Sequence, residues 1–128
     1  MNTKTENDIS YLIRGAIFKV YAHFGPGLFE SVYVAALEHE LMKSGLIVER
    51  EVAVPAYYDD KQLDVGFRLD LLVNDLVIIE VKSIETLMEV HHKQVITYLK
   101  LTQKKLAILV NFNCVDIEKG IFRKVNKL

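Results

Sequence analysis

Residues 63–82, LDVGFRLDLLVNDLVIIEVK, decide the fold that this sequence predicts. Apolar and polar residues alternate over residues 63–73, and a shorter apolar run over residues 77–82 ends in two opposite charges, Glu80 and Lys82. A period of two residues predicts strands, so the stretch predicts a hairpin of two strands. Because directly opposite residues of a hairpin share a face, its register decides which side chains become neighbours.

The apolar pattern distinguishes two possible registers of this hairpin. A two-residue loop would place Glu80 opposite Leu69, so that charges would face core residues. A shift by one residue gives one entirely apolar face instead. The pairs expected on that face are Val73–Val77, Leu71–Ile79 and Leu69–Val81. The pairs expected on the other face are Leu72–Ile78, Asp70–Glu80 and Arg68–Lys82. We therefore predict a loop of odd length, or a bulge, at residues 74–76.

The rest of the chain predicts an α/β domain with a central mixed sheet flanked by helices, in the order ααβββαββ. Helices are expected at residues 8–24, 28–44 and 87–101. Further strands are expected at residues 47–58, 106–112 and 117–125. Asp8 is the expected N-cap of the first helix and Gly45 follows the second, while Pro55 indicates an edge strand or a bulge. We expect a single domain over residues 1–128, with residues 1–7 as a disordered tail.

Composition excludes several classes of protein. The chain has 128 residues, 51% of them hydrophobic and 26% charged, which is typical of one folded domain rather than a disordered chain. No apolar run reaches the roughly 18 residues that a membrane span needs, and the polar N-terminus does not resemble a signal peptide. The single cysteine, Cys114, cannot form a disulfide within the chain. We therefore expect a cytoplasmic protein without membrane contact.

Charge is distributed unevenly along the chain, although the net charge is only −1. Residues 1–99 carry 9 basic and 15 acidic side chains, a balance of −6, whereas residues 100–128 carry 7 basic and 2 acidic ones, a balance of +5. A basic C-terminal segment could meet a polyanion such as nucleic acid. Charge alone favours the alternative, in which these lysines only solvate a terminal hairpin.

The predicted register places two carboxylates, Asp70 and Glu80, about 5 Å apart, where they repel each other unless a cation lies between them. Carboxylate oxygens are suitable ligands for Mg²⁺ or Mn²⁺. A divalent ion beside Lys82 suits phosphodiester hydrolysis, because the metal activates water and the ammonium stabilises charge or orients the nucleophile. Without other signals, the same residues and Arg68 fit better a salt-bridge network on a solvated sheet face.

Two of the predicted helices supply further candidates. Glu30 lies in the first turn of the second helix, where an acid stabilises the helix dipole by about 0.3–1 kcal/mol without any catalytic role. Gln94 and Tyr98 are neighbours at i and i+4 on the third helix. Their alternative role is the polar rim of an amphipathic helix.

Four motifs together resemble a known family. Residues 27–33, GLFESVY, fit a GxxExxY signature, and residues 94–98, QVITY, fit a QxxxY helix motif. Residues 67–73, FRLDLLV, followed by residues 79–82, IEVK, fit a D…ExK core. The chain resembles GxxExxY proteins, a branch of the PD-(D/E)XK nuclease superfamily, in the motif style of RecB-like exonucleases. The resemblance extends from about residue 9 to residue 125, with Asn113 at a position where relatives are expected to have glycine.

The resemblance implies a restriction-endonuclease-like core and a nuclease that depends on Mg²⁺ or Mn²⁺. The metal ligands that it implies are Asp70, Glu80 and Glu30, and the catalytic lysine is Lys82. The substrate-binding residues that it implies are Gln94, Tyr98 and Arg68. The implied substrate is nucleic acid, with DNA favoured over RNA.

A second hypothesis is a non-catalytic nucleic-acid-binding or protein-interaction module that retains the nuclease fold. The chain has only four arginines and no evident platform of aromatic and basic residues, fewer features than a nuclease that grips a duplex usually displays. A homodimer, or a partner protein that holds the nucleic acid, would supply what one chain lacks. Binding of Mg²⁺ or Mn²⁺ separates the enzyme from the module.

Overall fold

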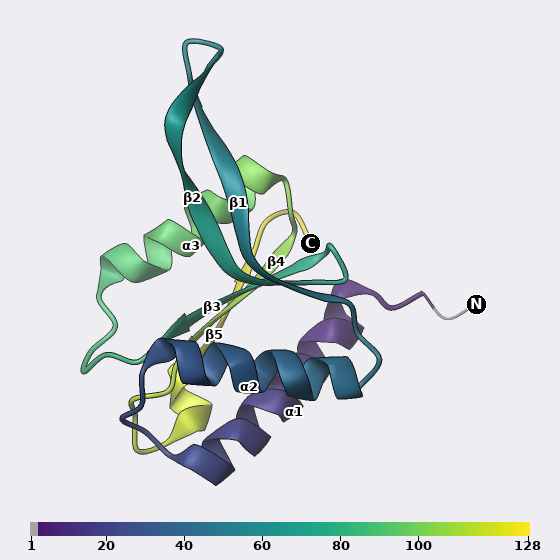
Figure 1. Cartoon of the computed structure of the whole chain (residues 1–128), viewed down its shortest axis with the longest axis vertical. Helices are drawn as coiled ribbons and strands as arrows, with labels where there is room; N and C mark the ends of the chain where they lie inside the picture. Colours follow the sequence, from purple (N-terminus) through teal and green to yellow (C-terminus); the bar gives the residue numbers. More distant parts are fainter. Residues whose placement is uncertain (1–2) are drawn as a thin grey trace.

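A five-stranded mixed sheet is the centre of the fold, and helices cover both of its faces (Figure 1). The structure is a computed structural model that describes residues 3–128. The strands are β1 (Val48–Tyr58), β2 (Lys61–Val73), β3 (Val77–Lys82), β4 (Leu106–Asn111) and β5 (Ile121–Val125). The helices are α1 (Glu6–Phe24), α2 (Glu30–Lys43), α3 (Glu89–Thr102) and a short 3₁₀ helix (Ile117–Gly120). The predicted α/β class and mixed sheet are confirmed. No helix of the described residues has the length and apolarity needed to cross a bilayer.

The strands lie in sequence order, β1-β2-β3-β4-β5, and only β3 and β4 run parallel. Helix α3 forms the crossover that a parallel connection requires. Because β3 and β4 run in the same direction, their C-terminal ends meet at one edge, where Lys82 pairs with Asn111. This edge carries the polar residues described below.

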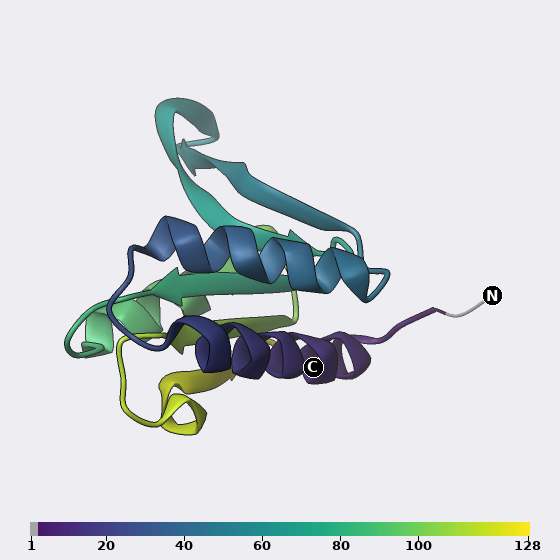
Figure 2. The same cartoon turned by 60° about the horizontal axis from the view of Figure 1, so that its bottom comes forward.

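Two apolar layers hold the sheet between the helices. Helices α1 and α2 lie side by side against one face, which presents alternate residues of the central strands, including Leu71, Ile79 and Ile108 (Figure 2). Helix α3 covers the other face through Val95 and Leu99. All six residues of β4 are buried, as the continuous apolar run predicts for a strand covered on both faces.

The predicted register of the β2–β3 hairpin is confirmed at its turn. The ladder pairs Val73 with Val77, Leu72 with Ile78 and Leu71 with Ile79. The three-residue turn between them is the predicted loop of odd length, with residues 74 and 75 both at positive φ.

On the N-terminal side of Leu71 the hairpin departs from the prediction, because β2 turns away from β3. The β2–β3 ladder stops at Leu71–Ile79, so the expected pairs Leu69–Val81 and Arg68–Lys82 are not part of it. Leu69 packs in the α3 layer, whereas Val81 packs in the opposite layer. The physical reason lies in β1, where Glu51 adopts a left-handed conformation (φ 50°) next to the residues that pair with Leu71 and Leu69. Such a residue bends and twists the ribbon, so simple alternation of faces does not continue through it.

The first helix begins earlier than predicted. Its N-cap is Thr5 rather than Asp8, and the two residues form a capping box. The Asp8 N–H donates to Thr5 Oγ1 at 3.2 Å, and the Thr5 N–H donates to Asp8 Oδ2 at 2.9 Å. Residues 6 and 7 are therefore helical rather than part of a disordered tail, and residues 1–2 of that expected tail lie outside the described residues.

The last strand is also shorter than the predicted one over residues 117–125. Residues 117–120 form the 3₁₀ helix, and only residues 121–125 pair with β4. The side chain of Asp116 accepts the Glu118 N–H at 3.2 Å and so favours a turn over an extended chain. Pro55 lies on an edge strand with a register shift beside it, as predicted, and Gly45 follows α2 with φ 84°.

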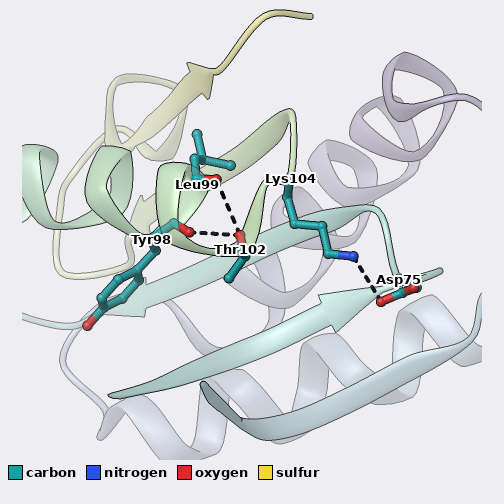
Figure 3. Close-up of polar contacts among 5 residues, drawn as sticks. All are labelled: Asp75, Tyr98, Leu99, Thr102 and Lys104. Carbon is teal, nitrogen blue, oxygen red and sulfur yellow. Dashed lines mark hydrogen bonds and ion pairs between the residues drawn. The ribbon is translucent and has the colours of Figure 1, made fainter. Parts of the chain in front are cut away.

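The C-terminal end of α3 is fixed by local contacts (Figure 3). The Thr102 hydroxyl donates to the Tyr98 carbonyl oxygen at 2.7 Å, and Lys104 Nζ lies 3.1 Å from Asp75 Oδ1 in the β2–β3 turn. An ion pair with so exposed a partner contributes at most about 1 kcal/mol. It nevertheless ties the α3–β4 connection to the hairpin that carries the site.

Candidate active site

Two carboxylates occupy the point where β2 separates from β3. The Asp70 N–H donates to Glu80 Oε1 at 3.1 Å, and the Val81 N–H donates to Asp70 Oδ2 at 2.7 Å. These side chains thus accept main-chain N–H groups that would otherwise pair across the ladder, and buried N–H groups require such partners. The predicted proximity of the two acids is therefore present, although a carboxylate–backbone arrangement replaces a regular strand pair.

Burial dominates the electrostatics of this acid pair. Glu80 is only 4% exposed, and burial, followed by the charge of Asp70, raises the pKa of the Glu80 carboxyl to about 8. Burial also raises the pKa of Asp70, although its hydrogen bond from Val81 and the charge of Lys82 act in the opposite direction. Without a cation, the pair therefore retains a proton at neutral pH.

Lys82 supplies the positive charge next to the acids. Its ammonium group lowers the pKa of both Asp70 and Glu80. The side chain is partly buried and forms no ion pair within residues 3–128. The lysine is therefore close enough to influence both carboxylates, yet its ammonium remains available for another anion.

Glu30 reaches the same edge of the sheet from the first turn of α2. Its Oε2 accepts the Ser83 N–H at 3.1 Å, and the Ser83 hydroxyl donates to the Leu28 carbonyl oxygen at 2.5 Å. These contacts join the start of α2 to the residue that follows Lys82. The charge of Glu30 also raises the pKa of Asp70, so the helix carboxylate contributes to the field of the acid pair.

Tyr33 holds the loop that precedes Glu30. Its hydroxyl donates to the Gly25 carbonyl oxygen at 2.6 Å and accepts the Leu28 N–H at 3.2 Å, while its ring stacks on Phe112 with centroids 4.1 Å apart. The loop that it holds bends at Gly25 and at residue 27, where φ is 67° and 97°. The tyrosine thus fixes the loop that leads directly into Glu30.

We expect Tyr33→Phe to lower the free energy of unfolding by about 1–2 kcal/mol, because the Leu28 N–H and the Gly25 carbonyl both lose a partner. Chemical denaturation measures this change. Tyr11→Phe is the matched control, since the Tyr11 side chain is 78% exposed and its loss of a hydroxyl should leave stability unchanged. Equal stability of Tyr33→Phe and the wild type would contradict the role given to this hydroxyl.

Helix α3 brings Tyr98 and Gln94 to the α3 side of the acid pair. Burial, followed by the charges of Glu80 and Asp70, raises the pKa of the Tyr98 hydroxyl, whereas a hydrogen bond with Gln94 lowers it. The Tyr98 ring stacks on Phe67 with centroids 4.6 Å apart and an interplanar angle of 3°. These two side chains of α3 therefore lie on the side of the acids, and their binding of substrate stays a prediction.

Arg68 is the candidate that the structure separates from the others. It is exposed on the part of β2 that has left β3, and it pairs with Ala53 of β1 rather than with Lys82. Its role in substrate binding stays a prediction.

Asn111 is a site residue that the sequence prediction missed. This buried side chain accepts the Ile84 and Asn113 N–H groups at 3.1 and 3.2 Å and donates to the Ile84 carbonyl oxygen at 2.9 Å. It thereby fixes the segment just after Lys82, including Ser83, which binds Glu30. In the sequence, Asn111 is the one polar residue of the apolar run LAILVN, residues 106–111, and a polar side chain buried at such a position needs hydrogen-bond partners.

The donor set at this edge fits a hard divalent cation held by few protein ligands. Asp70 and Glu80 each accept one main-chain N–H, and an ionised carboxylate has further lone pairs for a ligand. Mg²⁺ commonly binds one or two carboxylates together with water and substrate phosphate. Within residues 3–128 no group of three or more His, Cys, Asp or Glu side chains is arranged to hold a metal, so Glu30 as a third ligand stays a prediction.

Comparison with known proteins agrees with this geometry. The family model described as the PD-(D/E)XK nuclease superfamily matches residues 7–124, which reach from α1 into β5. No curated protein and no solved structure matches the chain. Assignment to the GxxExxY branch remains an expectation from the sequence. The matched region covers most of the chain and includes the whole acid–lysine site, and the protein therefore belongs to the PD-(D/E)XK nuclease superfamily.

Proposed function

We propose that this protein hydrolyses phosphodiester bonds of nucleic acid, with Mg²⁺ or Mn²⁺ as cofactor, at Asp70, Glu80 and Lys82. The observation that carries the proposal is the acid pair of buried Glu80 and half-buried Asp70, which lies beside a lysine that forms no ion pair within residues 3–128. A buried pair of acids is unfavourable unless a proton or a cation compensates it. Membership of a nuclease superfamily supports nucleic acid as the substrate.

Asp70 and Glu80 would hold the divalent cation, whose binding displaces the proton that the pair otherwise retains. When bound, such a cation activates water and offsets negative charge on the phosphoryl group. The hydrogen bonds from Val81 and from the Asp70 N–H hold one oxygen of each carboxylate, and the other oxygen would bind the cation. This preorganisation favours a defined geometry at the reacting phosphate.

Lys82, Gln94 and Tyr98 would act on the substrate itself. The Lys82 ammonium would stabilise the charge that develops on the phosphate, or orient the nucleophile. Gln94 and Tyr98 would donate hydrogen bonds to phosphate oxygens, while Glu30 positions the segment after Lys82 and contributes its negative charge to the cation site. Arg68 would contact the backbone farther from the cleaved bond.

A cleavage screen tests the proposal. The substrates are single- and double-stranded DNA and RNA, each with Mg²⁺, with Mn²⁺ and with a chelator, and DNA is the substrate that we expect to be cut. Glu80→Ala serves as the control for a contaminating nuclease and should abolish cleavage. If Mn²⁺ binds but no substrate is cut at any protein concentration, the hypothesis of an enzyme is wrong and that of a non-catalytic binding module is favoured.

A further inference from the structure

Phe29 is an exposed aromatic residue that directly precedes Glu30 in the candidate site. Its side chain is 84% exposed, whereas the side chains of Phe18 and Phe24 are 37% and 41% exposed. Burial of apolar surface is the main favourable contribution to folding, so a phenyl ring that stays in water adds little to the stability of the chain. The ring is therefore available for contact with a ligand.

Phe29 also occupies a backbone position that favours other residue types. It is the N-cap of α2, where Ser, Thr, Asp and Asn are preferred because a side-chain oxygen accepts an N–H group of the first turn. A phenyl ring has no oxygen that could do this. Phe29 is thus unfavourable for local stability in two respects, and residues that break local rules in this way are expected at functional sites.

Contacts on both sides of Phe29 fix its backbone against the site. The Leu28 carbonyl group, which is bonded to the Phe29 nitrogen, accepts the Ser83 hydroxyl at 2.5 Å. The carboxylate of Glu30, the next residue, accepts the Ser83 N–H at 3.1 Å. The backbone of Phe29 therefore lies against the residue that follows Lys82, and the two segments meet at one end of the molecule (Figures 1 and 2).

A nucleobase is the ligand that this ring fits. Every base has a flat π-face that stacks on an aromatic side chain, and such stacking needs no hydrogen bond from the ring. Each base is joined to the phosphate backbone through one sugar, so a ring beside the acid pair is within reach of a base when the strand lies in the site. A backbone that is already fixed also reduces the conformational entropy that binding costs.

We propose that Phe29 forms a stacking subsite for one base of a single-stranded nucleic acid. The inference rests on the proposed function, because it takes nucleic acid as the substrate of the acid–lysine site. It adds a preference for unpaired strands, since the bases of an intact duplex remain stacked on their neighbours and do not present a face to the ring. Phe29 would position the strand, whereas Asp70, Glu80 and Lys82 would act on the phosphate.

Binding of unpaired strands tests this subsite. Fluorescence anisotropy compares a short oligothymidine strand, an abasic strand of equal length and a duplex of equal length. The protein carries Glu80→Ala throughout, so that no cleavage disturbs the measurement. Adding Phe29→Ala to this parent should weaken binding of oligothymidine by about 5- to 150-fold, the range that corresponds to the loss of one base–aromatic stack. Binding of the abasic strand and of the duplex should stay within about twofold, because neither presents an unstacked base.

A tryptophan at the same position gives a second readout, which a purely structural residue would not give. The chain contains no tryptophan, so Phe29→Trp introduces a single indole. Oligothymidine should quench its emission, and the abasic strand should leave the emission unchanged. Tyr11→Trp is the matched control, because Tyr11 is also exposed but lies beside Ser44, at the opposite end of α2 from Phe29. The emission of this control should not respond to either strand.

Phe29→Ser separates binding from folding. Serine is a preferred N-cap, so this variant should melt no lower than its parent, yet it should bind oligothymidine as weakly as Phe29→Ala does. A loss of affinity that accompanies a lower melting temperature in both variants would indicate a structural role for the ring and would overturn the inference.

Other outcomes also decide the inference. Unchanged binding of oligothymidine by Phe29→Ala, an equal loss on the abasic strand, or unquenched emission of Phe29→Trp would each overturn it and leave the proposed hydrolysis untouched. A change in the sedimentation of Phe29→Ala without any change in strand binding would show that a second copy covers the ring instead. Quenching by oligothymidine together with a wild type that cuts no substrate would support the subsite and contradict only the hydrolysis.

Discussion

Lys82→Ala lowers the rate of phosphodiester cleavage by about 10²- to 10⁴-fold, the range that removal of one charge-stabilising or proton-transferring group typically costs. The reason is that the Lys82 ammonium lies beside the acid pair and forms no ion pair within residues 3–128, so its charge can oppose that of the phosphate. Its loss also removes the influence that lowers the pKa of Asp70 and Glu80. The rising limb of the pH–rate profile should therefore move to higher pH in the variant.

Single-turnover kinetics with saturating Mn²⁺ measure this effect, and the pH–rate profile separates it from simple unfolding. Lys93→Ala is the matched control, because Lys93 lies exposed on α3 and pairs with the exposed Glu89. Lys82→Arg, which keeps the charge, should recover part of the rate. Equal rates for Lys82→Ala and the wild type would contradict the assigned role.

Glu80→Gln makes the metal-free protein more stable at pH 8 than the wild type, by an amount of about 2–4 kcal/mol. Folding raises the pKa of Glu80 from its ordinary value of 4.5 to about 8. Between these values the folded state binds more protons than the unfolded state, so the stability of the wild type falls as pH rises from about 4.5 to 8. Glutamine carries no charge, and its amide oxygen still accepts the Asp70 N–H.

Thermal unfolding in the presence of a chelator, from pH 4.5 to pH 8.5, measures this difference. The gap between Glu80→Gln and the wild type should be small at the acid end and grow toward pH 8. Glu49→Gln controls for the loss of an exposed carboxylate and should show no such growth. A gap that does not change with pH would show that burial does not oppose ionisation of Glu80.

The register of the β2–β3 hairpin could be predicted because only one register keeps Leu71, Val73, Val77 and Ile79 on one face. The rule that alternate residues of a strand share a face failed at Leu69, because it assumes that a strand continues without a bend. The left-handed conformation of Glu51 bends the ribbon there, and nothing in the residue type indicates it. Backbone distortion set by tertiary context was therefore outside the reach of pattern reasoning.

The site was predictable to the extent that strand and helix ends determine it. Asp70, Glu80 and Glu30 meet at one edge because the strand ends and the first turn of α2 place them there. Asn111 was missed because two of its three hydrogen bonds are to Ile84, which is adjacent to it only in the folded chain. The start of α1 was misplaced because the apolar stripe begins at Ile9, whereas the capping box begins at Thr5.

Asp70 and Glu80 would hold a divalent cation, and calorimetric titration of Mn²⁺ measures this binding. Wild-type protein should bind one Mn²⁺ per chain, and Asp70→Asn should bind at least about tenfold more weakly. The variant should keep its melting temperature without metal, because its amide oxygen can still accept the Val81 N–H and the repulsion with Glu80 is relieved. Absence of Mn²⁺ binding to the wild type, or equal affinity in the variant, would contradict the claim.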